Sequence, residues 1–313
     1  MPTQVKNISL VTLNKARVLL AVRARIENKA NTDLQNILIG LGKKYIRAVI
    51  SRKQGLLHTK LQHDLNNFLH DIMLVGGLIG FRSGVNEKTK LQLSLLSDDL
   101  DVLDTVTKAT RDSLENFSRH VDDWVLPISQ RLTNEFDVQI DKMLQRGVAK
   151  GLSTSSIVDN ISSLLPNNSN WSIFREVRGQ VNRSYALGRE AALEEIKEFI
   201  VVEEYITVGD DRVRPEHWAR HGTRLPRNDP WWVRNTPPLD SLCRCIKIAH
   251  FDSRVKATKR PISIQGVKGL DKFNRPKLVS ANDPDAEQII DLDKELRFGD
   301  VGSLKQAWEL LKV

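Results

Sequence analysis

Two cysteines separated by a single residue, Cys243 and Cys245, close a segment whose composition differs from that of the chain before it. This segment, residues 209–245, also contains His217 and His221 and is rich in proline and tryptophan. A disulfide between the two cysteines would close a small, strained ring, so we expect reduced thiols, as in a cytoplasmic setting. Because proline at this density interrupts long helices, the segment is predicted to fold as a compact unit without long helices, which we call the knot.

The histidines and cysteines of this segment form a candidate metal site. His217 and His221 are four residues apart, so on one helical turn their side chains face the same way. With two thiols they make a His₂Cys₂ donor set of the kind that binds Zn²⁺, and four protein ligands leave no open position, which is the arrangement of a structural site. The candidate zinc ligands are His217, His221, Cys243 and Cys245. The alternative is polar packing inside the knot, with Arg214 paired to Asp210 or Asp211.

The zinc-enzyme patterns do not occur around these residues. The metalloprotease pattern requires Glu immediately after the first His, but Trp218 follows His217 and Glu216 precedes it. The zinc deaminase signature, His-x-Glu followed by Pro-Cys-x-x-Cys, is absent as well. We therefore predict that the chain is not an enzyme.

Helical periodicity dominates the first 199 residues. Helices are expected at residues 8–26, 34–49, 64–81, 100–124, 136–147 and 172–199. One helix is expected to stop near Pro127, and a boundary is expected at Gly151, after which Ser153 can cap the next helix. Residues 200–208 are rich in β-branched side chains and predict a strand. The predicted fold class is mainly α with a small C-terminal α+β knot, for which zinc is a candidate stabiliser, and an extended C-terminal arm.

One apolar run, residues 72–81, contains three glycines. Gly76 and Gly80 match the small-xxx-small pattern of close helix–helix contact. A helix that spans a bilayer needs about 18 apolar residues or more, and this run has ten. The pattern therefore favours a buried core helix, and no stable membrane insertion is expected.

The net charge of +8 is distributed in blocks. Residues 1–62 carry a net charge of +10, residues 97–123 carry −5 and residues 212–260 carry +8. Two basic blocks around an acidic one suggest a polyanion or an acidic protein surface as partner, although the first block can also be a solvated helix face. The candidate contact residues of the first block are Arg17, Arg23, Arg25, Lys43, Lys44 and Arg47.

Three regions are predicted along the chain. They are a helical N-terminal region (1–134), a central domain that ends with the knot (135–250) and an extended C-terminal arm (251–313). The arm lacks sustained periodicity until residues 304–311 and contains Pro261, Pro276 and Pro284. We expect it to order only against a partner, because it has few apolar clusters of its own.

Residues 207–246 closely resemble the C-terminal signature of the phage head-morphogenesis family, the minor head proteins typified by phage Mu protein F. The family pattern is Gly-Asp-x-Arg-x-x-His, a turn with Gly, Asp-Pro-aromatic-Trp, Pro-Pro and Cys-Arg-Cys. The matching positions are Gly209, Asp210 or Asp211, Arg214, His217, Gly222, Asp229, Pro230, Trp231, Trp232, Pro237, Pro238, Cys243, Arg244 and Cys245. The structural signature residues among them are Asp210, Asp211, Arg214, Trp232 and Arg244.

The resemblance extends upstream to about residue 135. Residues 145–152 and 177–188 are similar to two helical stretches of the family. Gly179 and Gln180 stand where the family usually has Thr-Glu, and His221 stands where an Asp is more usual. Both His and Asp can bind a metal, so the change at His221 is compatible with a zinc site.

The resemblance implies a low-copy structural protein of a tailed-phage head, a virion component that lies inside the capsid near the portal vertex and is assembled in the host cytoplasm. It implies a role in head assembly, and in genome packaging or ejection. The implied partners are the portal protein, the major capsid or scaffold protein, packaged DNA bound without sequence specificity, and further copies of the chain. Salt-sensitive phosphate contacts from the basic block would suit this place.

The alternative function is an enzyme carried in the virion, a nuclease or a toxin-related nucleotide-modifying protein, because some relatives carry such domains after the shared region. Here only 63 residues follow His250, which is short for an added catalytic domain. A sequence-specific DNA binder is not supported, because helix-turn-helix and zinc-finger spacings are absent.

Overall fold

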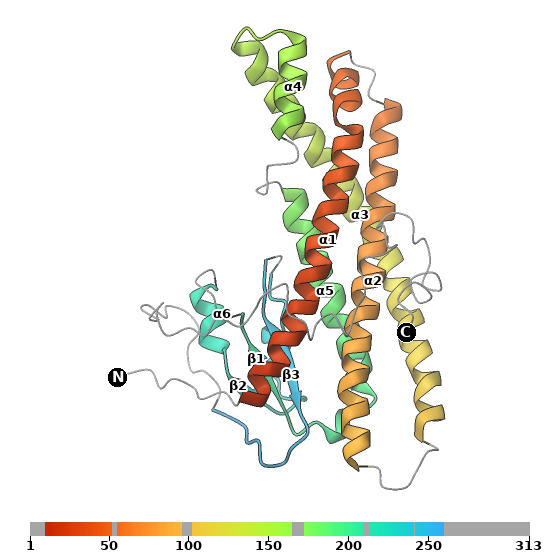
Figure 1. Ribbon diagram of the computed structural model, residues 1–313, viewed down its shortest axis with the longest axis vertical. Helices are drawn as coiled ribbons and strands as arrows, with labels where there is room; N and C mark the ends of the chain where they lie inside the picture. The colour runs from red at the N-terminus through yellow and green to blue at the C-terminus, as the bar shows by residue number, and fades with distance from the viewer. Residues whose placement is uncertain are drawn as a thin grey trace. The chain divides into compact units, whose positions relative to one another are not determined.

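The computed structural model describes residues 10–51, 55–95, 102–164, 172–208, 213–240 and 242–259. Most of them lie in helices α1 (Leu10–Ile50), α2 (Gly55–Leu95), α3 (Val102–Ala149), α4 (Thr154–Leu164) and α5 (Ser172–Glu194) (Figure 1). The other elements are the 3₁₀ turn η1 (Lys197–Phe199), strand β1 (Val202–Ile206), helix α6 (Pro215–Arg220), strand β2 (Thr223–Leu225), helix α7 (Trp232–Asn235) and strand β3 (Ile246–His250). The predicted mainly α fold with a small α+β part is confirmed for these residues.

Helix α1 is continuous where the sequence predicted two helices, at 8–26 and 34–49. Its buried stripe runs through the predicted gap, because Ile26, Ala30 and Leu34 are fully buried. Residues spaced by four lie on one side of a helix, so these three side chains share one packed face. Packing along this face therefore extends the helix over both predicted segments.

Helix α3 runs through Pro127, so the prediction that a helix stops there is wrong. A proline inside a helix removes one backbone hydrogen bond and costs about 3 kcal/mol. The buried side chains that flank it on the packed face of α3 are Val121, Val125, Leu132 and Phe136. Burial of each such side chain contributes about 1.5–3 kcal/mol, which together exceeds the cost of the proline. Pro127 itself lies on the exposed face.

The boundary after α3 forms as expected. Gly151 adopts a φ of 66°, in the left-handed region that favours glycine, and the Leu152 N–H donates to the Gly147 carbonyl at 3.1 Å. The Ser153 Oγ accepts the backbone N–H of Ser156 at 3.2 Å and so caps α4. Both the predicted break and the predicted cap are confirmed.

Replacing Ser153 by Ala removes this cap and will lower the free energy of unfolding by about 1 kcal/mol. Because Ser153 is exposed, the substitution creates no cavity. Urea denaturation measures the change. The matched variant is Ser163→Ala at the other end of α4, where the exposed hydroxyl donates to the Asn160 carbonyl and the loss should be a fraction of that at Ser153. Equal losses for the two variants would contradict a cap at Ser153.

The glycines of α2 bring its backbone into contact with α5. A Cβ atom added to Gly188 of α5 would lie 1.8 Å from the carbonyl oxygen of Gly77, and one added to Gly80 would lie 2.0 Å from the carbonyl oxygen of Tyr185. These distances leave no room for any side chain, so the two helices touch through their backbones. The predicted close contact is confirmed at Gly80, and the structure adds Gly77 and Gly188 to it.

One stretch of α2, Leu57–Val85, is long and apolar enough to cross a membrane by length and composition alone. In the described part of the chain, 83 % of its most apolar window is buried inside the protein. Residues 72–81 are all buried, which confirms the predicted core helix.

The three strands form an antiparallel sheet in the order β2-β1-β3. All five residues of β1 are buried, and the strand predicted at 200–208 is confirmed. The N-terminal turns of α1 lie beside this sheet (Figure 1). The core cluster between them consists of Ala16, Leu19, Leu20, Ile206, Val208, Ile246 and Ile248. A second cluster consists of Tyr205, Leu225, Trp232, Cys243 and Cys245, so the two cysteines are core residues.

The chain divides into two compact units, each assembled from separate stretches. Among the described residues, the first unit contains α1 up to Arg25, α2 from Gly76, α3 up to Leu114, and the chain from Asn182 onward with the sheet. The second contains α1 from Ile26, α2 up to Val75, α3 from Glu115, α4, and α5 up to Val181. Helix α3 passes through residue 134 without a break. The division predicted at residues 134 and 250 stays a prediction.

Most of the predicted C-terminal arm, residues 260–313, lies outside the described residues. Its described part follows β3 and reaches β2. The Thr258 N–H donates to the Arg224 carbonyl at 2.8 Å, and the Arg224 N–H donates to the Thr258 Oγ1 at 2.9 Å. The first residues of the arm therefore lie along the outer edge of β2.

Candidate metal centre

His217, Cys243 and Cys245 come together in the core of the first unit. Their ligand atoms all lie within 4.8 Å of one another, and all three side chains are buried. The Nδ1 of His217 lies 3.6 Å from the Cys243 Sγ and 3.4 Å from the Cys245 Sγ. In a tetrahedral zinc site, bonds of about 2.3 Å to sulfur and about 2.0 Å to nitrogen separate the two ligand atoms by about 3.6 Å. Among the described residues, these three donors therefore fit three of the four positions of a tetrahedral zinc site.

Helix α6 positions the histidine. Pro215 occupies its first turn, where the fixed φ of proline favours a helix start, and the N–H groups of His217 and Trp218 both donate to the Arg214 carbonyl. The Nε2 of His217 lies 3.1 Å from the Asp240 carboxylate. A carboxylate on the far nitrogen of a metal-binding histidine fixes the ring orientation. Here it turns Nδ1 toward the two sulfur atoms.

Asp240 ties the loop before Cys243 to α6. Its carboxylate accepts the backbone N–H of Leu242, and its carbonyl accepts the N–H of Cys243, each at 3.0 Å. Arg214 donates to the same carboxylate. Burial raises the pKa of Asp240, but the hydrogen bonds from Arg214 and Leu242 outweigh it and leave the pKa below its ordinary value. An ionised Asp240 is a strong acceptor for the His217 N–H.

The two thiols have different pKa values. A hydrogen bond from Cys245 lowers the pKa of Cys243 to about 4, and the bond with His217 adds to this effect against the opposing effect of burial. Burial raises the pKa of Cys245 well above its ordinary value. Burial also lowers the pKa of His217, but the bond with Cys243 outweighs it and leaves the pKa raised. The thiolate is the form in which a cysteine binds a metal, so Cys243 is prepared for that role.

Two donors from distant helices hold the backbone of the Cys-Arg-Cys motif. Asn182 of α5 donates to the Cys243 carbonyl at 3.0 Å, and Arg23 of α1 donates to the Cys245 carbonyl at 3.0 Å. Both donors are buried. The roles of Asn182 and Asp240 were not predicted, because their partners lie in other elements and no local spacing signals the contact.

The predicted fourth ligand, His221, is not part of this cluster. Helix α6 ends at Arg220, so His221 has left the helical conformation and the four-residue spacing no longer aligns it with His217. Its Nδ1 accepts the backbone N–H of Thr207 at 3.0 Å, and its ring stacks on Trp218 with centroids 4.7 Å apart. In the described part of the chain, three of the four predicted metal ligands therefore come together.

Both thiols of the cluster are buried among the described residues. The side chains of Cys243 and Cys245 are 1 % and 3 % exposed. A cavity beside Cys245 has a volume of about 20 Å³, which holds about one water molecule. In the described part of the chain, a metal held by these three side chains would join α6 to the strand entering β3.

Comparison with known proteins places this cluster in a family context. Residues 138–248 match the family described as Phage Mu protein F like protein. The predicted resemblance is confirmed over these residues, which include all three members of the cluster. The chain is also 29 % identical over 113 residues to an uncharacterized protein of Methanocaldococcus jannaschii. That match covers 36 % of this chain and 17 % of the archaeal protein, and no solved structure matches the chain.

The signature residues of the Mu protein F like region support the cluster. Trp232 is buried, and its indole N–H donates to the Pro226 carbonyl at 3.0 Å. Arg214 holds Asp240, as described above. Arg244 is half-buried between the two cysteines. The remaining two signature residues, Asp210 and Asp211, lie outside the described residues.

A buried ion-pair network joins the Mu protein F like helix α5 to the sheet. Lys247 lies 2.8 Å from Glu203 and 3.0 Å from Glu190, and its ammonium group also lies 5.2 Å from the Trp232 ring centroid. Arg227 pairs with the same two glutamates. Burial raises the pKa of Glu203, and the nearby Glu190 raises it further, whereas both cations oppose this change. No local pattern in the sequence predicted this network.

Basic side chains cover the free edge of β3. This strand ends the sheet, and the carbonyls of every second residue on its outer side accept a cationic donor: Cys245 from Arg23, Lys247 from Arg189, and Ala249 from Lys15. An uncovered strand edge can pair with another chain, and charged side chains prevent this. Part of the basic N-terminal block is thus structural.

This arrangement corrects one predicted contact residue. Arg23 is 4 % exposed and bonded to Cys245, so it is not available to DNA or to a partner protein. Arg17 and Arg25 are half-buried, whereas Lys44 and Arg47 are exposed on α1. The side chain of Lys43 lies outside the described residues. Lys44 and Arg47 remain the candidate contacts that the structure leaves accessible.

Replacing Arg23 by Gln will lower the free energy of unfolding by about 2 kcal/mol, because a buried charged donor to the Cys245 carbonyl is lost. Lys44→Gln and Arg47→Gln remove the same charge from exposed sites and should change stability by less than about 0.5 kcal/mol. Chemical denaturation of the three variants makes the comparison. Equal stability of Arg23→Gln and the two surface variants would contradict a structural role for Arg23.

Proposed function

We propose that this chain is a minor structural protein of a tailed-bacteriophage head. The observation that carries the proposal is the match of residues 138–248 to the Phage Mu protein F like family, over a segment whose His217, Cys243 and Cys245 form one buried cluster. The protein is proposed to be a virion component that lies inside the capsid near the portal vertex, to be assembled in the host cytoplasm, and to act in head assembly and in packaging or ejection of the genome.

Zinc is the metal that fits the cluster best, and its proposed role is structural. Two thiolates and one imidazole favour Zn²⁺ over hard cations such as Mg²⁺ and Ca²⁺, which prefer oxygen ligands. His217, Cys243 and Cys245 would hold the ion, which would join α6 to the strand entering β3 and supply folding energy to the knot. The burial of both thiols supports a structural role over a catalytic one.

The proposed partners are the portal protein, the major capsid or scaffold protein, packaged DNA and further copies of the chain. Charge supports the DNA contact, because Lys44 and Arg47 are exposed on the second unit. Contacts between such side chains and phosphates weaken as salt is raised. The variant Lys44→Gln/Arg47→Gln should therefore flatten the salt dependence of DNA binding, whereas Arg23→Gln should not.

A cryo-EM map of the portal vertex from intact particles tests the proposed place. Density for the Mu protein F like region next to the portal, in few copies, is the expected result. Density elsewhere in the particle would overturn the portal assignment, but the proposal of a head protein would stand.

The purified protein should show no nuclease and no NAD-consuming activity, and a robust activity in either assay would favour the alternative of a virion-borne enzyme.

A further inference from the structure

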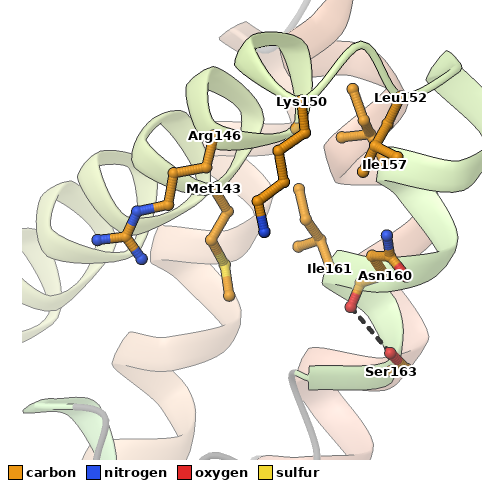
Figure 2. A pocket seen from close by; sticks show the side chains of 9 residues that line it. Met143, Arg146, Lys150, Leu152, Ile157, Asn160, Ile161 and Ser163 are labelled. Carbon is orange, nitrogen blue, oxygen red and sulfur yellow. Dashed lines mark hydrogen bonds between the residues drawn. The ribbon is translucent and has the colours of Figure 1, made fainter.

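The corner between α3 and α4 contains a cavity of about 360 Å³. It lies entirely within the second unit, between the last turns of α3 and one face of α4 (Figure 2). Its apolar lining consists of Met143, Gly147, Leu152, Ile157 and Ile161. A cavity of about 150 Å³ can bind a benzene ring, so this one has room for more than one aliphatic side chain.

The tight joint between the two helices gives this groove a fixed shape. A Cβ atom added to Gly147 would lie 2.6 Å from the Ile157 side chain, so α3 and α4 pack closely at that point. Ile157 and Ile161 form the buried face of α4. Leu152, which also lines the cavity, remains 38 % exposed. The groove is thus lined by apolar side chains, one of which is accessible from outside.

The charged residues of the groove are all basic. Arg146 and Lys150 line it, and the other polar lining residues, Asn160 and Ser163, are neutral. Figure 2 shows the Lys150 side chain reaching into the space between the two helices, with Ile161 nearby. An occupant that is both apolar and acidic would match this lining, since carboxylates would meet the two cations while aliphatic side chains fill the groove.

The chain itself contains such a segment after the described residues. Residues 283–298 carry six acidic and two basic side chains, a net charge of −4. Ile289, Leu292 and Leu296 recur at the spacing of one helix face. Pro284 follows Asp283 at the start, which is typical of a helix N-terminus, and Gly299 follows the last apolar residue, as at a helix end. Residues 283–298 are therefore a short acidic segment with aliphatic side chains, and its pattern is too brief to count as sustained periodicity along the arm.

We propose that the groove between α3 and α4 binds residues 283–298 of the same chain. Ile289, Leu292 and Leu296 would enter the groove, and the flanking carboxylates would face Arg146 and Lys150. The other parts of the arm fit less well, because residues 260–280 carry a net charge of +4 and residues 301–313 a net charge of +1. This proposal is independent of the proposed function.

Photo-crosslinking of the full-length protein tests it. The photoreactive residue p-benzoylphenylalanine replaces Leu152 at the rim of the groove, and mass spectrometry identifies the peptide that is captured. The expected product is a link to residues 283–298 within one chain. The same residue at Val138, a similarly exposed apolar position of α3 outside the groove, should not capture this peptide. Placement at Met143, another lining residue of the groove, gives a second probe in case the first variant folds poorly.

Charge reversal provides a second readout. Lys150→Glu should lower the crosslink yield roughly two- to fivefold, the range expected for a surface ion pair, and Asp291→Lys/Asp293→Lys in that background should restore it. Capture of another segment, or no capture at Leu152 and Met143, would overturn the proposal. If the crosslink joined only two separate chains, the groove would bind a second copy of the protein, and the proposal would be overturned as well.

Discussion

Replacing Cys243 by Ser is expected to unfold the knot around β1–β3 and to abolish the proposed binding of zinc. A structural zinc contributes on the order of 10 kcal/mol to the folding of zinc-finger peptides, so loss of one thiolate should cost more than about 4 kcal/mol here. Hydrogen exchange measured by mass spectrometry should show lost protection in residues 202–250. Protection should persist in α1, α2 and α3 of the second unit, whose cores do not include the cluster.

The matched control is His221→Ala. This variant removes another buried histidine of the same knot, but the structure places it outside the cluster, with Thr207 as its partner. We expect it to keep one equivalent of metal and to lose about 1–2 kcal/mol, the cost of leaving a buried N–H unpaired. Loss of metal from His221→Ala would restore the predicted set of four ligands and contradict the set of three.

Metal removal separates a zinc site from a polar packing cluster. A strong chelator should lower the stability of the native protein to that of Cys243→Ser and should leave Cys243→Ser unchanged. If elemental analysis of the native, untagged protein finds far less than one equivalent of zinc, the three side chains are packing residues, and Trp232 and the proline-rich loops hold the knot without a metal.

Replacing Gly188 by Ala is expected to destabilise the contact between α2 and α5 by about 3 kcal/mol or more. The new Cβ would lie 1.8 Å from the Gly77 carbonyl oxygen. The obstacle is backbone and not a flexible side chain, so only separation of the helices can relieve the overlap. Thermal and urea denaturation measure the loss, and Gly80→Ala should behave in the same way.

Gly40→Ala is the control for this pair of variants. Gly40 lies on the exposed side of α1, and a Cβ there meets nothing within 4 Å. Alanine at such a helical position stabilises by about 0.5–1 kcal/mol, because glycine loses more backbone entropy on folding. Gly188→Ala and Gly40→Ala are chemically identical substitutions, but we expect the first to lower the stability and the second to raise it. A stability loss below about 1 kcal/mol for Gly188→Ala would contradict the backbone contact.

Local signals predicted much of this structure. The periodic helices, the strand at 200–208, the glycine break and the Ser153 cap depend on neighbouring residues and form where expected, except that the helix predicted at 172–199 ends at Glu194 and a 3₁₀ turn follows it. The helix was wrongly predicted to end near Pro127, because the packing of other side chains of α3 outweighs the local effect of the proline. The helical turns of α1 between residues 26 and 34 were missed for the same reason, because burial of Ala30 in the core stabilises them and the local pattern does not show this.

The candidate site shows the same limit. The cluster of His217, Cys243 and Cys245 could be predicted from the sequence, because histidine and cysteine are residue types that bind metals. Asp240 and Asn182 could not be assigned, since common polar residues acquire such roles only through tertiary contacts. His221 was misplaced because helical spacing was assumed beyond the end of a six-residue helix. Arg23 was assigned to the surface by its charge, whereas the fold uses it to satisfy a buried carbonyl.

We propose that this chain is a structural component of a phage head. Quantitative mass spectrometry of gradient-purified, DNA-filled heads, with and without protease treatment of the intact particles, is the measurement that tests this proposal. We expect a few copies of the chain per head, resistant to protease until the heads are opened. Absence of the chain from purified heads, or its complete digestion on intact particles, would contradict the account.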